Sequence, residues 1–186
     1  MSAAGVQIAL LRGVMPTGKN RVPMAELRAL LEGLGFEDVR TLLATGNAVF
    51  RSTGPGGAAL EALLEREIAA RIGPQLDVMV RDALQWKRLA AANPFPEDAA
   101  ERPGKLLAVV LKGKPAAAGA RAFEAGVQAP EKAKVVGDVA WVLFTDARSL
   151  GRMLSPAVMK RTLAVSGTAR NWNTVQKIAQ AAEAAA

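Results

Sequence analysis

The sequence predicts an α+β protein made of two lobes in tandem, each with an antiparallel sheet and helices packed on it. Short apolar runs bounded by glycine or proline indicate strands, and longer segments with apolar residues three or four positions apart indicate helices. Over residues 4–92 their order is strand, helix, strand, strand, helix, strand. That order is the split βαβ arrangement of ferredoxin-like folds, also called the α-β plait. The second half repeats most of the same order.

The first half has recognisable start and stop signals. Residues 6–12 are too short an apolar run for a helix and therefore favour a buried strand. Pro23 opens a helix that Gly35 ends, and Gly46 with Asn47 suits the tight turn of a hairpin because both tolerate positive φ. We expect strands at residues 6–12, 39–44, 48–51 and 76–81. We expect helices from Pro23, over residues 58–72, and from Asp82 to a point before Asn93.

The second half begins after a segment without periodicity. Residues 93–104 are rich in proline and alanine, which predicts a linker. We therefore expect an N-terminal lobe over residues 1–95, a linker over 96–104, and a C-terminal lobe with an additional final helix over 105–186. Within that lobe the patterns predict strands at 105–112, 134–136 and 139–144, and helices at 115–123, from Ser155-Pro156, and from Asn173 or Thr174.

Composition excludes several classes of enzyme. The chain has neither cysteine nor histidine, which removes disulfides, thiolate nucleophiles, sulfur metal sites and the commonest general base. Catalysis would need carboxylates, lysine, backbone amides, a cofactor or a hard cation such as Mg²⁺. The sequence identifies no particular metal site or cofactor.

No feature of the sequence indicates a membrane protein. No apolar run reaches the roughly 20 residues that cross a bilayer, and no basic segment precedes the first strand. We therefore expect a cytoplasmic protein that has no membrane partner.

Positive charge is concentrated in the second half. Of 24 basic and 17 acidic residues, residues 1–100 hold 11 of each, which leaves 24 − 11 = 13 basic and 17 − 11 = 6 acidic residues in the remainder. No acidic residue lies between Asp146 and Glu183. We therefore expect this half to attract anionic partners.

The segment from Gly13 to Asn20 has the spacing of a phosphate-binding loop, in which backbone amides surround a phosphate and a lysine reaches its oxygens. Asn20, however, replaces the hydroxyl residue that would bind Mg²⁺, and Pro23 delays the helix. A connecting loop shaped by its glycines explains the pattern without a ligand. Between these interpretations we favour a general anion site near the start of the helix. Its candidate residues are Arg12, Gly13, Gly18, Lys19, Asn20 and Arg21, with Asn47 of the hairpin added.

A second polar segment, residues 168–174, is expected as a loop ahead of the final helix. It offers a cation, two amides and an indole, which suit a nucleotide, a carboxylate or a peptide. Capping by Asn173 and packing of Trp172 explain these two residues without a ligand. Capping and packing do not explain Arg170 and Asn171, which precede them. The candidate ligand-binding residues of this segment are Arg170, Asn171, Trp172 and Asn173.

The predicted sheet invites comparison with RNA-recognition modules, which stack bases on exposed aromatic residues. Ala48 stands where such a ring would be needed, and Phe50 is expected in the core. Aromatic residues make up 4% of the chain, and the first lobe is neutral, so specific RNA binding there is not favoured. Nonspecific contact between nucleic acid and the basic second lobe is left open.

Several short segments, taken in order, resemble a known family. They are Leu10–Gly13, Gly18–Asn20, Gly46–Phe50, Asn93–Phe95 and Arg170–Val175. Together they are similar to the bacterial domain of unknown function numbered 1697, over about residues 6–182. The resemblance implies two successive α+β lobes of the ferredoxin-like type, and it implies no reaction, substrate or cofactor. Two segments depart from the family's pattern. The family usually has an Asn and a Gly within residues 14–17, which are Val-Met-Pro-Thr here. It frequently has Ser-Lys-Leu where residues 152–154 are Arg-Met-Leu.

Three functions are compatible with these patterns. The first is a binding module for an anionic small molecule or nucleotide, bearing a phosphate or carboxylate, in a cleft between residues 12–21 and 168–174. The second is an interaction protein or homo-oligomer whose basic C-terminal lobe contacts an acidic partner or nucleic acid without catalysis. The third is an enzyme that works without histidine or cysteine. The first hypothesis requires both segments to face one cleft.

Overall fold

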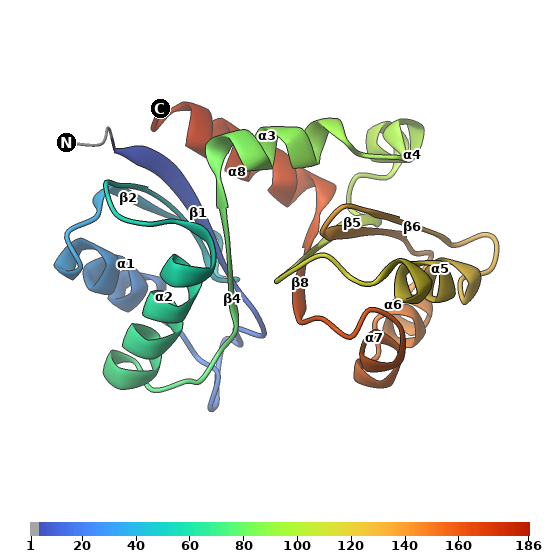
Figure 1. Cartoon of the computed structure of the whole chain (residues 1–186), viewed down its shortest axis with the longest axis horizontal. Helices are drawn as coiled ribbons and strands as arrows, with labels where there is room; N and C mark the ends of the chain where they lie inside the picture. The colour runs from blue at the N-terminus through green and yellow to red at the C-terminus, as the bar shows by residue number, and fades with distance from the viewer. Residues whose placement is uncertain (1–3) are drawn as a thin grey trace. The chain divides into compact units, whose positions relative to one another are not determined.

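The computed structural model describes residues 4–186, which divide into two compact units. The first unit holds the described residues up to Arg88 together with Gln176–Ala186, and the second holds Leu89–Val175. Each unit contains one four-stranded antiparallel sheet. Helices α3 (Ala83–Ala91) and α8 (Trp172–Glu183) carry the chain across the two boundaries between the units (Figure 1).

The first unit has the element order expected from the sequence. Its strands run in the spatial order β2-β3-β1-β4, which is the ferredoxin-like arrangement. Helices α1 and α2 both lie on one face of this sheet (Figure 1). The elements are β1 (Gly5–Leu11), α1 (Met24–Gly33), β2 (Glu37–Leu42), β3 (Asn47–Ser52), α2 (Gly57–Arg71) and β4 (Val78–Asp82).

The core of the first unit follows from alternation along the strands. Ala9 and Leu11 of β1 point toward the helices, and they pack in one cluster with residues of α1 and α2. Phe36, which follows the end of α1, stacks on Phe50 of β3 with ring centroids 4.6 Å apart. Residues on the opposite face, such as Ile8, are also fully buried. Strand β1 is therefore a nearly continuous apolar run instead of an alternating one.

The second unit repeats this arrangement with additional helices. Its sheet has the order β6-β7-β5-β8, which matches the first sheet strand for strand. Helices α5, α6 and α7 contribute side chains to one core cluster with the strands. The elements are α4 (Pro96–Glu101), β5 (Leu106–Leu111), α5 (Ala117–Ala125), β6 (Lys132–Val136), β7 (Val139–Leu143), α6 (Ala147–Met153), α7 (Pro156–Thr162) and β8 (Gly167–Asn171).

Three elements of the second unit were not predicted. Helix α4 lies within the segment expected as a linker, and neither α6 nor β8 was anticipated. Helix α6 contains Ser149 and Gly151, which are weak helix formers, and it depends on the capping box of Asp146 and Ser149. Strand β8 is polar and short, and it is held as a strand by its pairing with β5. Local sequence patterns do not report such long-range pairing.

Helix α4 is fixed to the sheet by a buried carboxylate. Asp98 accepts a hydrogen bond of 2.7 Å from Lys132 Nζ at the start of β6, and a second one from the guanidinium of Arg102. The hydrogen bond from Lys132 is the largest cause of a pKa below the ordinary value of 3.8 for Asp98, and Arg102 lowers it further, while burial opposes the shift. Asp98 is therefore ionised and connects two elements that would otherwise have few common contacts.

The lowered pKa predicts how stability depends on pH. Because the folded pKa is below the unfolded value of 3.8, the contribution of Asp98 is fully present above that pH and is lost as the pH falls through the folded pKa. Urea denaturation above and below pH 3.8 should show a smaller acid-induced loss of stability in Asp98→Asn than in the wild type. If the free energy of unfolding fell equally with pH in the two proteins, this assignment would be contradicted.

Among the helices within residues 4–186, none combines the length and the apolar character that crossing a bilayer requires.

Candidate functional site

The loop that resembles a phosphate-binding loop is closed by its own backbone. Gly13 and Gly18 have φ values of 72° and 80°, a region that favours glycine. The amide of Met15 donates to the carbonyl of Asn20 at 3.0 Å, and the amide of Arg21 donates to the carbonyl of Gly18 at 3.2 Å. Two of the loop's amides are therefore occupied by the turn itself.

The three cations of this loop have different surroundings. Arg12 Nη1 lies 3.1 Å from Asp77 Oδ2, so its charge is already paired. Lys19 and Arg21 are exposed, and within residues 4–186 neither side chain has a hydrogen-bonding or ionic partner. These two residues are the part of the loop that is available to an anion. Asn20 is also exposed, with its side-chain amide near Gly13.

The hairpin turn lies directly against the start of this loop. Gly46 has a φ of 75°, and a Cβ atom built there would lie 2.7 Å from Leu11 Cβ and 2.8 Å from Val14 Cγ2. Asn47 is buried, and its Nδ2 donates to the carbonyl of Leu42 at 2.8 Å and to Thr45 Oγ1 at 3.0 Å. These bonds give the Asn47 side chain a structural role in the turn.

Residues 168–171 lie in strand β8, so the expectation of a loop there is wrong. Arg170 pairs with Ala108 of β5, and its side chain is 7% exposed. Its Nη1 donates to Thr168 Oγ1 and to the carbonyl of Ala169, both at 2.8 Å. Burial lowers the pKa of the Arg170 guanidinium to about 10, which leaves it charged at neutral pH.

The cap of the final helix is Asn171, not Asn173. Asn171 Oδ1 accepts hydrogen bonds from the amide and from Oγ1 of Thr174, both at 2.9 Å. Helix α8 therefore begins at Trp172, and Asn173 is an exposed residue of its first turn. Asn171 acts as the cap because Thr174, three residues later, donates to it through both its amide and its hydroxyl. The Trp172 ring packs on Trp141 with centroids 5.9 Å apart.

The loop at residues 12–21 belongs to the first unit, and residues 168–174 belong to the second. The cleft expected between these two segments stays a prediction.

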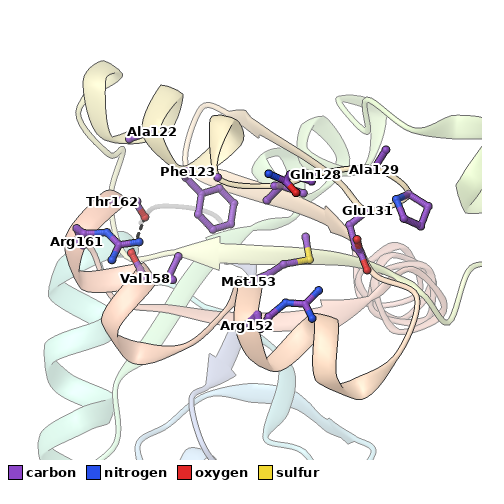
Figure 2. A pocket seen from close by; sticks show the side chains of 13 residues that line it. Ala122, Phe123, Gln128, Ala129, Glu131, Arg152, Met153, Val158, Arg161 and Thr162 are labelled. Atoms are coloured by element: carbon purple, nitrogen blue, oxygen red, sulfur yellow. Dashed lines mark hydrogen bonds between the residues drawn. The ribbon is translucent and has the colours of Figure 1, made fainter.

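A pocket lies entirely within the second unit, between α5, the loop that follows it, α6 and α7 (Figure 2). Its volume is about 580 Å³, which is within the range of small-molecule sites. It is lined by Ala122, Phe123, Gly126, Val127, Gln128, Ala129, Pro130, Glu131, Arg152, Met153, Val158, Arg161 and Thr162.

The lining divides into an apolar centre and charged ends. Phe123 and Met153 are core residues whose surfaces form the centre of the pocket, and Val158 extends it along α7. Figure 2 shows Arg161 and Glu131 on opposite sides of this centre, with Arg152 below Met153. A small molecule in this pocket would therefore meet apolar atoms along its body and charge at its ends.

The charges of the pocket are unequally balanced. Glu131 Oε1 accepts a 2.8 Å hydrogen bond from Thr145 Oγ1, which is the largest cause of a pKa below the ordinary value for Glu131. The positive charge of Arg152 lowers the same pKa further, so these two groups attract each other. Arg161 is exposed and has no acidic partner among the described residues. It is the cation whose charge is not compensated.

The helix ends around the pocket are capped by side chains of the chain itself. At α6, Asp146 Oδ1 accepts from the amide of Ser149 at 2.8 Å, and Ser149 Oγ accepts from the amide of Asp146 at 3.2 Å. At α7, Ser155 Oγ accepts from the amide of Val158 at 3.3 Å, and the first helical residue is Pro156, which has no N–H. A side-chain cap therefore occupies one first-turn amide at each of these two helix starts.

This pocket was not predicted from the sequence. The sequence showed that Arg152 and Arg161 lie in a stretch without acids, but it gave no sign that they border a cavity. The opposite wall comes from α5 and residues 126–131, and only tertiary packing brings these segments together. Residues 4–186 contain no group of three or more acidic residues placed to hold a metal ion.

Comparisons with known proteins identify the family and the fold. The structure of the conserved bacterial protein SP0830 from Streptococcus pneumoniae is similar to this chain, with a TM-score of 0.71 and 21% sequence identity over 97% of this chain and 99% of the other. No curated protein matches significantly. The model of the family described as "Protein of unknown function (DUF1697)" matches residues 5–141, so the chain belongs to this family.

Proposed function

We propose that the protein is a binding module for small anionic molecules and that the ligand occupies the pocket of the second unit. The observation that carries the proposal is an exposed, uncompensated Arg161 at the border of a concave pocket with an apolar centre. A guanidinium binds carboxylate or phosphate oxygens through two parallel hydrogen bonds. The apolar centre adds affinity through burial of the ligand's body.

The proposal keeps the anion-binding function expected from the sequence but places the ligand in the pocket of the second unit. Among the expected ligand residues, Asn47, Arg170 and Asn171 have partners within their own unit. Lys19 and Arg21 are available, but they lie on an exposed loop. A pocket is the better site because it removes more of a ligand's surface from water.

The test compares two arginines of the same helical region. Arg161→Gln removes the uncompensated cation of the pocket, whereas Arg148→Gln removes an exposed cation of α6 that does not line it. Calorimetric titration with a panel of organic carboxylates and phosphates should show saturable binding to the wild type and at least about tenfold weaker binding to Arg161→Gln. Arg148→Gln should bind as the wild type does. Absence of saturable binding by every anion would refute the proposal.

A second candidate is contact between the basic lobe and nucleic acid or an acidic partner. Four exposed cations, which are Arg148, Arg152, Lys160 and Arg161, lie on the consecutive helices α6 and α7. Such binding depends on total charge and weakens steeply with salt. Retention on DNA that falls equally in Arg148→Gln and Arg161→Gln, and not in Lys19→Ala, would favour this candidate.

A further inference from the structure

We infer that the ligand of this pocket is a monocarboxylate with an apolar body, in preference to a nucleotide or another polyphosphate. The inference rests on the proposed function, because it names the chemical class that the same pocket would select. Three observations support it independently: the charge of the lining, the state of the nearby amides and the composition of the centre.

The charge of the lining matches one negative charge. Its ionisable residues are Arg152, Arg161 and Glu131, which give 2 − 1 = +1. Because Glu131 and Arg152 attract each other, a carboxylate gains most at Arg161. A polyphosphate would bring several negative charges close to Glu131, and like charges repel each other.

The two helix starts near the pocket are already capped by side chains of this chain. Proteins usually hold phosphate groups with amides at a helix N-terminus or in a glycine-rich loop. Here Asp146 caps the amide of Ser149 in α6, and Ser155 caps the amide of Val158 in α7, whose first residue Pro156 has no N–H. A carboxylate needs fewer donors, and one guanidinium supplies them in bidentate geometry.

The centre of the pocket favours an aliphatic or aromatic body. Phe123, Met153 and Val158 offer carbon and thioether surface between the two charged ends. Methionine adapts to ligands of different shape, and the edge of a phenylalanine ring contacts both alkyl chains and other rings. We therefore place the carboxylate at Arg161 and the apolar body over Phe123 and Met153.

The experiment uses a homologous series of ligands. Calorimetry or ligand-observed NMR with hexanoate, octanoate and decanoate should show affinity rising about threefold to fourfold per added methylene, until the pocket is filled. Uncharged 1-octanol should bind at least about tenfold more weakly than octanoate. Pyrophosphate and ADP should not displace octanoate.

Two variants locate the site. Arg161→Gln should reduce the affinity for octanoate by at least about tenfold and should remove most of the preference for octanoate over 1-octanol. Val158→Trp should block binding by filling the pocket, with circular dichroism and the unfolding midpoint showing that the protein remains folded. Arg148→Gln is the control that should leave both affinities unchanged.

The outcomes separate this inference from the proposed function. If pyrophosphate or ADP binds in a way that depends on Arg161 and octanoate does not, the inference is overturned while the proposed function stands. If octanoate binds equally well to Arg161→Gln and to the wild type, it binds elsewhere and the inference is overturned. If no anion of either class binds, both fail.

Discussion

Replacing Gly119 with alanine is expected to reduce the free energy of unfolding by about 3 kcal/mol, because it introduces an atom where helices α5 and α7 touch. A Cβ atom at this position would lie 2.1 Å from the carbonyl oxygen of Thr162 and 3.1 Å from its carbon. Both are backbone atoms at the end of α7, so the contact cannot be relieved by rotating a side chain. The helices would have to separate.

The same substitution is expected to affect the pocket, whose walls include α5 and α7. Urea denaturation gives the change in stability, and titration with the pocket ligand gives the change in affinity. The matched control is Gly151→Ala in α6, where a Cβ atom would meet nothing within 4 Å. That variant should be more stable than the wild type by about 0.5–1 kcal/mol, since alanine favours the helix. A Gly119→Ala protein as stable as the wild type would contradict the close helix contact.

Elements with a clear local signal were predicted correctly. The apolar runs that became β1 and β5, and the Ser155-Pro156 start of α7, contain strong signals within a few residues. Strand β8 has the sequence Gly-Thr-Ala-Arg-Asn, which resembles a loop and becomes a strand only by pairing with the apolar β5. The fold class was therefore predictable from the sequence, whereas this edge strand depends on contacts distant in the sequence.

The repeated architecture extends to individual residues. Arg81 of β4 and Arg170 of β8 are both buried, and each donates through Nη1 to the carbonyl of the preceding residue, at 2.7 and 2.8 Å. The next residue in each case caps the following helix, since Asp82 Oδ1 accepts from the amide of Gln85 and Asn171 Oδ1 accepts from that of Thr174. This shared chemistry involves only a few neighbouring residues in each unit, so the sequence pattern alone is too short to reveal it.

The candidate site was less predictable than the fold. Asn, Thr and Gly occur both in ligand sites and in helix caps or turns. Only their hydrogen bonds show that Asn171 and Asn47 have structural roles. The pocket in turn depends on Phe123, Met153 and Arg161, which lie on three different helices. No regular spacing connects them in the sequence.

Replacing Glu61 with alanine is expected to cost about 3 kcal/mol, because it removes a buried carboxylate that satisfies an edge strand. Glu61 of α2 is 5% exposed, and its Oε1 accepts a 2.9 Å hydrogen bond from the amide of Val80 in β4. The same oxygen lies 3.9 Å from Arg81 Nη1, whose side chain is also buried. Alanine would leave the Val80 amide without this acceptor and Arg81 without the nearby negative charge.

Glu65→Ala provides the matched control, one helical turn away on α2. Glu65 makes the equivalent bond of 2.8 Å to the amide of Val78, but its carboxylate is only partly buried, so water can replace it. Its loss should therefore cost about 1 kcal/mol. If urea denaturation gave equal losses for the two variants, burial would not be what distinguishes them. A small loss for both would contradict the stabilising role assigned to Glu61.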